Sequence, residues 1–368
     1  MEKVILFGGS FDPVHNGHIF IAKKALEFIN GDKAIFVISS SPRWKEIKNN
    51  DEHREKMMRL ALEDEPNLDY STIEFTLKGK GKYTIDTIEE ILKNDEKDGK
   101  KRDYYFLIGE DQLEKLHDWH RIDELCTLIK FIAYNRDENY FSLIAKENAQ
   151  KYCVQLIEGK TYECSSTLVR ELKSIDVKEN VLKYIVDNHL YKYDDIYKLI
   201  DDKRYRHSVS VAFLALEIAK SNNLDKYKCF IASMLHDVGK DVNKNIHYME
   251  EEWTSYKDLP FKVIHQFIGA SIAKHEFDIK DEDILSSIAY HCSGRASMSL
   301  LERVVYASDK MDPLRKYDSS ALIKACLEDI ENGFVVVLDA NKEYLENKSV
   351  DFNNLLTDQC FKFYLNKE

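Results

Sequence analysis

The sequence predicts two successive parts, a doubly wound parallel α/β sheet in the first half and an all-α helical bundle in the second. In the first half, short apolar runs alternate with amphipathic stretches, whereas from Tyr193 onward only helical periodicity remains. A chain of 368 residues, 44% of them hydrophobic, is long enough to form two domains with separate cores. We therefore expect one domain at residues 1–192 and a second at residues 193–368.

Strand-like runs and helical stretches alternate regularly through the first domain. The expected strands are Val4–Phe7, Ala34–Ile38, Tyr104–Ile108, Phe131–Tyr134 and Val154–Ile157. The expected helices are Ile19–Ile29, Glu52–Glu63, Thr84–Leu92 and Tyr140–Ala149. This alternation is typical of a Rossmann-like sheet, which binds ligands at the carboxyl ends of its strands. The charged run at residues 93–102 is expected to form a solvated loop.

The first strand leads directly into a glycine-rich turn that contains two histidines. The run reads Gly8-Gly9-Ser10-Phe11-Asp12-Pro13-Val14-His15-Asn16-Gly17-His18. Glycines lack a Cβ and let the backbone approach phosphate oxygens, and the start of the next helix presents free N–H groups. Histidines placed there can donate hydrogen bonds to a phosphate during transfer, and a plain strand–helix turn is the weaker interpretation.

A second motif, Ser165-Ser166-Thr167-Leu168-Val169-Arg170, lies far along the same domain. Its hydroxyls can cap a helix or bind phosphate, and the Arg170 guanidinium suits the β- and γ-phosphates of a nucleotide. Together the two motifs resemble the signature of the nucleotidylyltransferase superfamily, whose members condense ATP with a phosphorylated partner and release pyrophosphate. The resemblance implies Mg²⁺ bound with ATP, and catalytic roles for His15, His18 and Arg170. It implies an ATP and phosphate site made of Gly8, Gly9, Ser10, Phe11, His18, Ser165, Ser166, Thr167 and Arg170.

Two other segments narrow the expected substrate. The run Lys82-Tyr83-Thr84-Ile85-Asp86-Thr87 and the run Phe106-Leu107-Ile108-Gly109-Glu110-Asp111, followed by Trp119, resemble bacterial nicotinate-nucleotide adenylyltransferases. In that family, backbone N–H groups receive the nicotinate carboxylate and a tryptophan stacks on the pyridine ring, which agrees with their chemistry. The implied nicotinate mononucleotide site consists of Lys45, Tyr83, Thr84, Asp86, Gly109, Asp111 and Trp119. A different phosphorylated acceptor, such as phosphopantetheine, is the alternative.

Helical periodicity dominates the second domain. The expected helices are Tyr205–Lys220, Tyr227–Leu235, Val263–Glu276, Glu282–Tyr290 and Leu300–Lys310, with further helices from Ser320 to the end. Pro260 and Pro313 separate helices, as expected for residues that break them.

Histidines and aspartates recur along these helices at intervals of about one helix pair. The candidate metal ligands are His207, His236, Asp237, His265, His291 and Asp309. Imidazole nitrogens mixed with carboxylates suit transition metals such as Fe, Mn, Co or Zn, and a carboxylate can bridge two ions. A single buried histidine is usually structural, but chance burial is a poor explanation for six such residues on successive helices.

The same set resembles the HD-domain phosphohydrolases, which are named for the adjacent His-Asp pair. The stretches Leu235–Lys240 and His291–Arg295, with Asp309 and Asp312-Pro313, are similar to the bacterial symmetrical diadenosine tetraphosphatases, although Asp312 stands where glutamate is usual. The resemblance implies cleavage of diadenosine tetraphosphate into two ADP, with two metal ions, most often iron. It makes Asp237 and Lys240 catalytic. Cations implied to bind the polyphosphate are Arg204, Lys240, Arg295 and Arg315.

Two alternatives remain for the second domain: another nucleotide substrate, or a regulatory ligand-binding module without turnover. Composition limits the partners of the whole chain. A net charge of -12 argues against nucleic-acid and membrane binding, and leaves ATP, nicotinate mononucleotide and diadenosine tetraphosphate as expected partners. Seven scattered cysteines without a Cys-x-x-Cys pair, and the lack of a long apolar segment, predict a cytoplasmic protein. A homo-oligomer is compatible with the sequence.

Overall fold

The computed structural model describes residues 1–40, 48–77, 83–135, 141–159, 162–241, 249–315, 317–347 and 354–366. The chain divides into two compact units, Met1–Leu190 and Tyr191–Glu368. The observed division lies two residues before the boundary expected from the sequence.

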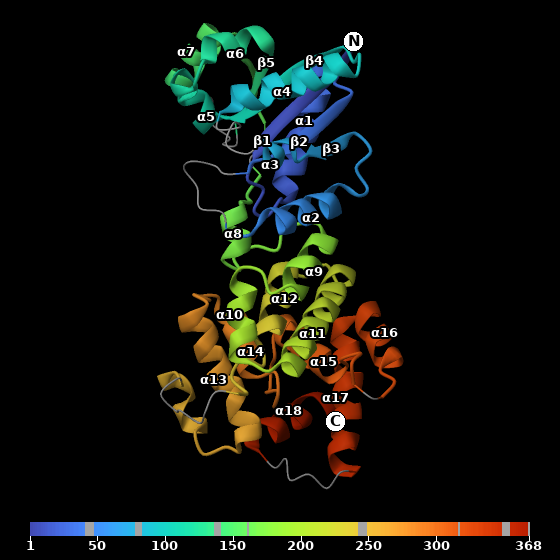
Figure 1. Cartoon of the computed structure of the whole chain (residues 1–368). Helices are drawn as coiled ribbons and strands as arrows, with labels where there is room; N and C mark the ends of the chain where they lie inside the picture. The colour runs from blue at the N-terminus through green and yellow to red at the C-terminus, as the bar shows by residue number, and fades with distance from the viewer. Residues whose placement is uncertain are drawn as a thin grey trace. The chain divides into compact units, whose positions relative to one another are not determined.

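The first unit is built on a sheet of six parallel strands in the order β3-β2-β1-β4-β5-β6 (Figure 1). The strands are β1 (Glu2–Gly9), β2 (Lys33–Ile38), β3 (Leu68–Ser71), β4 (Arg102–Gly109), β5 (Lys130–Tyr134) and β6 (Gln155–Ile157). This order reverses between β1 and β4, and ligands of such sheets bind at the carboxyl ends of the strands near that reversal.

Helices lie on both faces of the sheet, and α9 packs on α2. The helices of this unit are α1 (Asn16–Ile29), α2 (Asp51–Leu62), α3 (Ile73–Thr76), α4 (Thr84–Lys97), α5 (Glu110–Glu114), η1 (Leu116–Asp118), α6 (Ile122–Leu128), α7 (Leu143–Tyr152), α8 (Ser166–Arg170) and α9 (Glu179–Asp187). Val4 and Leu6 of β1 share one core with Ile85 of α4 and Leu125 of α6, whereas α1 packs against β1, β2 and β5. The predicted doubly wound parallel fold is confirmed.

Two local expectations are corrected. The charged run at 93–102 is helical as far as Lys97, because polar residues on an exposed helix face extend α4, and only residues 98–101 form the turn before β4. Asp95 in the added turn of helix is buried and accepts hydrogen bonds from Tyr104 and Arg102. The edge strand β3, with one buried residue among its four, had no apolar pattern that could predict it.

The second unit is helical throughout the residues that the structure describes. Its helices are α10 (Lys192–Leu199), α11 (Asp202–Ser221), α12 (Lys226–Leu235), η3 (Glu251–Tyr256), α13 (Phe261–Glu276), α14 (Glu282–Ala289), α15 (Leu300–Lys310), α16 (Ser320–Glu328), α17 (Ile330–Asn347) and α18 (Leu355–Leu365). Helix α12 packs against α11, α13, α14 and α15, so it occupies the centre of the bundle (Figure 1).

The position of α12 determines where the His-Asp pair lies. Its last seven residues, Cys229 to Leu235, are all buried, and His236 and Asp237 follow directly at its end. A central helix thus brings both side chains into the interior of the bundle. Among the described helices of the whole chain, none combines the length and the hydrophobicity that crossing a membrane requires.

Candidate active sites

The turn after β1 brings the glycine-rich motif to the carboxyl edge of the sheet. A Cβ on Gly9 would lie 3.0 Å from the ring of Phe11. The glycine therefore leaves room for the Phe11 side chain to fold back over the turn. Phe11 itself has a φ of 45° and is buried. This compact turn separates β1 from the start of α1.

His15 and His18 lie at the N-terminus of α1 with their ring centroids 3.6 Å apart. The His15 backbone N–H donates to Nδ1 of His18 across 3.2 Å. A ring nitrogen that accepts a hydrogen bond carries no proton, so the neutral His18 ring holds its proton on Nε2. The side chain of His18 therefore has an N–H donor for an anion, as its predicted role requires.

Side chains of the second motif donate hydrogen bonds to main-chain carbonyls of the first motif, although more than 150 residues separate the partners. Ser166 Oγ donates to the Pro13 carbonyl across 2.8 Å, and Arg170 Nη1 donates to the Asp12 carbonyl across 2.6 Å. Arg170 Nη2 also donates to Thr167 Oγ1 across 3.0 Å, so described residues accept from two of its five N–H groups. Ser165 caps α8 by accepting from the Leu168 N–H.

Sequence reasoning missed a buried cation behind this turn. Arg54 of α2 has no exposed surface and donates through Nη1 to the carbonyls of Ser10 and Ser39 at 3.0 and 2.6 Å. It also pairs with Asp51. Arg54 therefore ties α2 to the residues that follow β1 and β2. A single arginine on a polar helix is common in sequences, so it gave no signal of this role.

The predicted nicotinate residues gather around the start of α4 and the end of β4. Thr84 opens α4, and the ring of Tyr83 stacks on His120 at 4.0 Å between centroids. Trp119 is half-buried and touches Phe106 and Phe131 edge to face, with 6.0 Å between centroids in each case. His120 was not predicted, while Lys45 lies outside the described residues.

The remaining predicted nicotinate residues also lie at element ends. Asp86 accepts the Tyr83 N–H at 3.2 Å, which is a helix-capping contact. Gly109 ends β4, and Asp111 lies exposed in the first turn of α5. The capping contact gives Asp86 a structural function in addition to the one expected.

The six predicted metal ligands converge inside the second unit. Two sets of three ligand atoms lie within 4.8 Å of one another: His207, His236 and Asp309, and His236, Asp237 and His291. His265 completes the cluster, with Nε2 3.3 Å from Nε2 of His291 and 3.6 Å from Oδ1 of Asp237. Five of the six are buried, and His207 is partly so.

Hydrogen bonds orient the imidazoles so that their Nε2 atoms point into the cluster. Nδ1 of His236 lies 2.6 Å from the Ser233 carbonyl, and Nδ1 of His291 lies 2.8 Å from the Ile288 carbonyl. Because a carbonyl only accepts, each Nδ1 carries the proton and each Nε2 keeps a lone pair for a metal. Nδ1 of His207 is oriented in the same way by Oδ2 of Asp312, which lies 2.6 Å away. Asp312 was not among the predicted site residues.

The carboxylate of Asp237 also fits a metal ligand. Its Oδ1 lies 3.4 to 3.6 Å from Nε2 of His236, His265 and His291, yet it has no hydrogen-bond partner among the described residues. A buried, unpaired carboxylate oxygen facing three imidazoles is costly unless a cation binds there. The donor set of the cluster therefore fits transition-metal ions.

Burial and charge set the protonation states of these ligands. Burial lowers the pKa of His236 to about 3 and that of His265 to about 4, so both imidazoles are neutral at pH 7. Burial acts in the same direction on His207, but Asp309 and Asp312 outweigh it and raise its pKa to about 9. Burial would raise the pKa of Asp237, but the ammonium of Lys240 at 2.6 Å helps to hold it well below its ordinary value.

Cations surround the two aspartates. Lys240 Nζ lies 2.6 Å from Asp237 Oδ2, and Asp309 binds Arg315 and Lys310, each at 2.8 Å. Lys310, which also donates to the His291 carbonyl, was not predicted. The same charges that neutralise the aspartates here are available to phosphate oxygens of a substrate.

The other two predicted polyphosphate cations are held by carboxylates. Arg204 pairs with Asp201 at 2.7 Å and with Asp241, so a polyphosphate would have to share it with both. Among the described side chains, the guanidinium of Arg295 donates through Nε–H to the buried Glu302 at 2.7 Å, and it lies 4.5 Å from the centroid of Tyr290.

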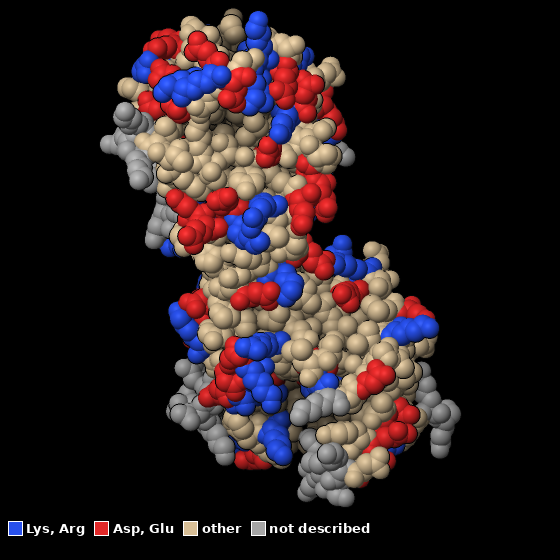
Figure 2. Space-filling model, turned by 45° about the vertical axis from the view of Figure 1, so that its right-hand side comes forward, with Lys and Arg blue, Asp and Glu red and all other residues tan. Residues whose placement is uncertain are grey.

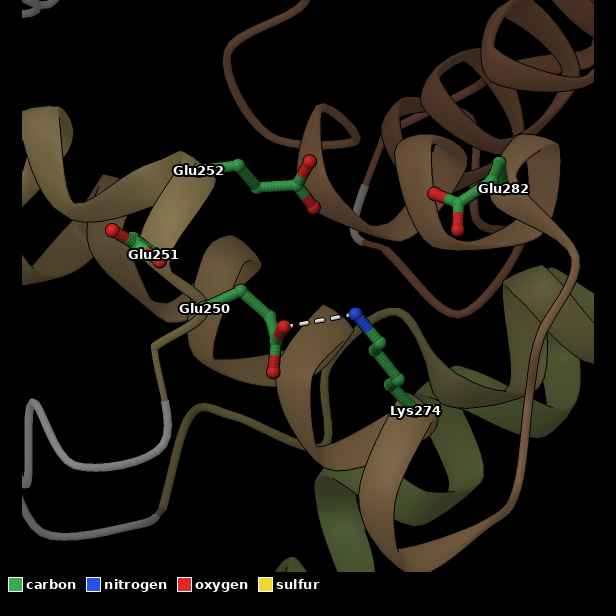
Figure 3. Close-up of a pocket in the computed structure, with 5 residues that line it drawn as sticks. All are labelled: Glu250, Glu251, Glu252, Lys274 and Glu282. Carbon is green, nitrogen blue, oxygen red and sulfur yellow. Dashed lines mark hydrogen bonds and ion pairs between the residues drawn. The ribbon is translucent and has the colours of Figure 1, made fainter.

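A separate hollow of about 540 Å³ opens beside η3, α13 and α14 (Figure 3). It is lined by Glu250, Glu251, Glu252, Lys274 and Glu282. Glu250 pairs with Lys274 at 2.8 Å, as the dashed line in Figure 3 marks. Four carboxylates against one ammonium repel phosphate, and none of the predicted site residues lines this hollow.

Known proteins resemble the chain along nearly its entire length. Residues 6–172 match the cytidylyltransferase-like family, and residues 204–314 match the HD domain family. A Mycoplasma genitalium protein named "probable nicotinate-nucleotide adenylyltransferase/Ap4A hydrolase" is 32% identical over 363 residues, which cover 94% of this chain and 98% of that protein. A Bacillus pumilus protein named "probable nicotinate-nucleotide adenylyltransferase" is 32% identical over 200 residues, covering 52% of this chain and 100% of that protein.

Among the solved structures that resemble part of the chain is a "predicted HD superfamily hydrolase involved in NAD metabolism" from Clostridium acetobutylicum. It is 27% identical and covers 48% of this chain and 99% of its own, with a TM-score of 0.41.

The fold and the matched families define a two-enzyme chain, in which an α/β nucleotidyltransferase precedes an HD-domain hydrolase. The similarity to the Mycoplasma genitalium protein extends over nearly the full length of both chains. The chain therefore belongs to the family of nicotinate-nucleotide adenylyltransferase/Ap4A hydrolases.

Proposed function

We propose that the domain of residues 1–192 transfers the adenylyl group of ATP to nicotinate mononucleotide, giving deamido-NAD and pyrophosphate. The observation that carries this proposal is the junction of the two motifs, in which Ser166 and Arg170 bond to the main chain of Pro13 and Asp12. That junction places hydroxyls, a guanidinium and the start of α1 around one turn. Each of these groups binds phosphate oxygens.

In this mechanism the phosphate of nicotinate mononucleotide attacks the α-phosphorus of ATP, and pyrophosphate leaves. The Nε2–H of His18 donates to an α-phosphate oxygen as negative charge develops there, and His15 positions the phosphates. Arg170 and the hydroxyls of Ser165 and Thr167 bind the departing β- and γ-phosphates. The same charges would be shielded by Mg²⁺ bound to ATP.

Recognition of the acceptor follows from the start of α4. The first N–H groups of a helix have no partner within the helix, so those of Thr84 and Ile85 suit the nicotinate carboxylate. Trp119 offers an indole face to the pyridine ring, and Asp111 accepts from a ribose hydroxyl. The same arrangement disfavours phosphopantetheine, which has neither a carboxylate nor an aromatic ring at that point.

We further propose that the domain of residues 193–368 hydrolyses diadenosine tetraphosphate symmetrically to two ADP. The convergence of four imidazoles and two carboxylates supports this, since imidazole nitrogens mixed with carboxylate oxygens are a ligand set for transition metals, of which two are expected here, with iron as the expected ion. Such ions would supply a water of lowered pKa as the nucleophile. Asp237 would hold the ions together with the histidines and Asp309, while Lys240, Arg295 and Arg315 would bind the phosphates.

Small nucleotides are the partners that we propose for both halves, in the cytoplasm. Figure 2 shows Lys and Arg interspersed with Asp and Glu on the face that it draws, in line with the net charge of -12. A long nucleic-acid backbone binds best to a continuous basic surface. Each of the seven cysteines is free, which suits a reducing compartment.

One experiment tests both activities. The purified chain is incubated with ATP plus nicotinate mononucleotide, and separately with diadenosine tetraphosphate, and products and bound metals are identified. We expect deamido-NAD in the first reaction, ADP alone in the second, and two transition-metal ions per chain. ATP plus AMP as products would contradict symmetric cleavage, and a metal-loaded chain that binds but does not hydrolyse nucleotides would favour a regulatory module.

A further inference from the structure

The last helix of the chain packs against the loop that carries Arg295. This loop, residues 291–299, connects α14 to α15, beginning at His291 and ending at Ser299, the N-cap of α15. Helix α18 lies beyond residues 204–314, the segment that matches the HD domain family. Three of its side chains, from Thr357, Cys360 and Tyr364, contact the loop.

Thr357 binds the first part of the loop. Its hydroxyl donates to the Ser293 carbonyl across 3.1 Å and accepts from Nδ2 of Asn354 across 3.0 Å. Ser293 is buried, so its carbonyl needs a donor from the protein. The hydroxyl of Thr357 supplies that donor and has its own direction fixed by Asn354.

Tyr364 binds the last part of the loop. Its hydroxyl oxygen accepts the Met298 backbone N–H across 2.6 Å, and its ring packs edge to face on Phe334 of α17 with centroids 5.0 Å apart. Arg303 donates to the Met298 carbonyl across 3.1 Å and lies 5.3 Å from the Tyr364 ring. Both main-chain groups of Met298 are thus satisfied by residues that contact one another.

Cys360 lies between these two contacts, against Gly294. A Cβ on Gly294 would approach Cys360 Sγ to 2.7 Å, and Gly294 has a φ of +66°, so both the close contact and the backbone conformation favour glycine at this position. Helix α18 therefore packs on the loop backbone directly before Arg295.

The Arg295 side chain is arranged to bind an anion. Glu302 accepts only its Nε–H, and among the described residues neither terminal amino group of the guanidinium has a hydrogen-bond partner. A guanidinium held at Nε presents two parallel N–H donors, which is the geometry that phosphate oxygens accept. Its position depends on the loop backbone as much as on Glu302.

We propose that Thr357, Cys360 and Tyr364 of α18 are positioning residues for the hydrolase, which place Arg295 for the polyphosphate through the backbone of residues 293–298. This inference rests on the proposed role of Arg295 in the second domain. It assigns a function to the end of the chain, where the sequence contains no recognisable motif. A positioning role predicts an effect on substrate binding, because Arg295 contacts phosphate rather than the attacking water.

The test uses the full-length, metal-loaded protein and the initial rate of ADP formation from diadenosine tetraphosphate. Tyr364→Phe removes only the acceptor for the Met298 N–H, and Thr357→Val removes only the hydroxyl. A lost hydrogen bond of about 1 kcal/mol corresponds to about a fivefold rise in KM. We expect that rise in each variant, with kcat within about twofold, unchanged metal content and unchanged adenylyl transfer.

Two controls accompany these variants. Thr357→Ser keeps the hydroxyl and should restore the wild-type KM. Gln359→Ala changes an exposed residue of the same helix and should leave KM unchanged, so a raised KM in this variant would indicate a general loosening of α18.

A double-mutant cycle separates positioning from simple stability. Arg295→Gln alone should raise KM, and adding Tyr364→Phe to it should raise KM no further, because the group being positioned is gone. The proposal would be overturned if Tyr364→Phe raised KM fivefold both in the wild-type protein and in Arg295→Gln. It would also be overturned if Arg295→Gln raised KM and Tyr364→Phe left KM unchanged. An unchanged KM in Arg295→Gln would refute the role of Arg295 and this inference with it, whereas a wild-type chain that makes no ADP would refute the proposed hydrolase substrate.

Discussion

Single hydrogen bonds to the main chain give the histidines of the two candidate sites opposite tautomers. Nδ1 of His18 accepts a backbone N–H, so its Nε2 is a proton donor. Nδ1 of His236 and of His291 donates to a backbone carbonyl, so their Nε2 atoms are lone-pair ligands. A phosphoryl-transfer site needs the first kind and a metal site needs the second. The sequence reveals the histidines, but only the local backbone decides the tautomer.

The donor role of His18 leads to a prediction for His18→Ala. Loss of one donor to a developing negative charge costs about 3 kcal/mol, so adenylyl transfer should fall about 100-fold or more. Hydrolysis of diadenosine tetraphosphate should stay within about twofold, and both rates are measured on the same preparation. His53→Ala serves as the control, because His53 lies at the start of α2 and pairs with Tyr184. Near-normal transfer by His18→Ala would refute the assignment.

The first N–H groups of α4, which have no partner within the helix, lead to a second prediction, about substrate choice. A carboxylate accepts from the Thr84 and Ile85 N–H groups, whereas the amide nitrogen of nicotinamide mononucleotide would face them with donors of its own. An unpaired buried donor costs about 1–3 kcal/mol, so we expect at least about a tenfold preference for the nicotinate form in kcat/KM. Equal values of kcat/KM for the two mononucleotides would count against this pocket.

At the scale of elements, periodicity predicted the long helices and central strands well, because their buried faces are large. The helix expected at Leu300–Lys310 has those bounds in the structure. Edge strand β3 was missed because most of its short length is only half-buried. The contacts of Arg54 with the ends of β1 and β2 were missed because they depend on tertiary position rather than on a local pattern.

The residues of the two sites were predictable to different extents. The six metal candidates could be chosen from sequence because their residue types are unusual in helices and repeat along the chain. Asp312 and Lys310, which contact His207 and Asp309, are ordinary surface residue types in sequence and became site residues only through the fold. The contacts of α18 with the loop at 291–299 belong to the same class.

The connection of α1 to α9 gives a prediction about stability and pH. Glu65 has a nearly buried carboxylate that pairs with Lys23 of α1 at 2.6 Å and with Lys178, the N-cap of α9, at 2.9 Å. Burial would raise its pKa, but the two lysines outweigh burial and lower it below the ordinary value of 4.5. A lowered folded-state pKa means that Glu65 stabilises the fold above pH 4.5, and that this contribution disappears as the pH falls through the folded-state pKa.

We therefore expect Glu65→Gln to lower the free energy of unfolding of the first unit by about 1 kcal/mol at pH 7. The difference from wild type should shrink steadily below pH 4.5. Hydrogen exchange of peptides from α1 and α9, followed by mass spectrometry at pH 7 and in the acid range, measures both values. Asp32→Asn is the control at an exposed carboxylate. A difference that stays constant on acidification would show that the pairing with the lysines is not its cause.

At the scale of the whole molecule, the two candidate sites are built entirely from different units. Every predicted residue of the transferase site precedes Leu190, and every predicted metal ligand follows Tyr191. Each unit has its own buried core, so each can keep its structure when the site of the other is damaged. The two activities should therefore be separable by single substitutions.

Asp237→Ala tests this separation from the side of the hydrolase. Its carboxylate faces His236, His265 and His291 through Oδ1 and Lys240 through Oδ2, so its loss removes charge compensation shared by the whole cluster. We expect fewer than two metal ions per chain by elemental analysis and at least about a 100-fold loss of ADP formation, with adenylyl transfer within about twofold of wild type. Asp258→Ala, at an exposed position of the same unit, should leave both rates unchanged. Full hydrolysis by metal-free Asp237→Ala would contradict the metal mechanism, and a parallel loss of both activities would contradict their division between two units.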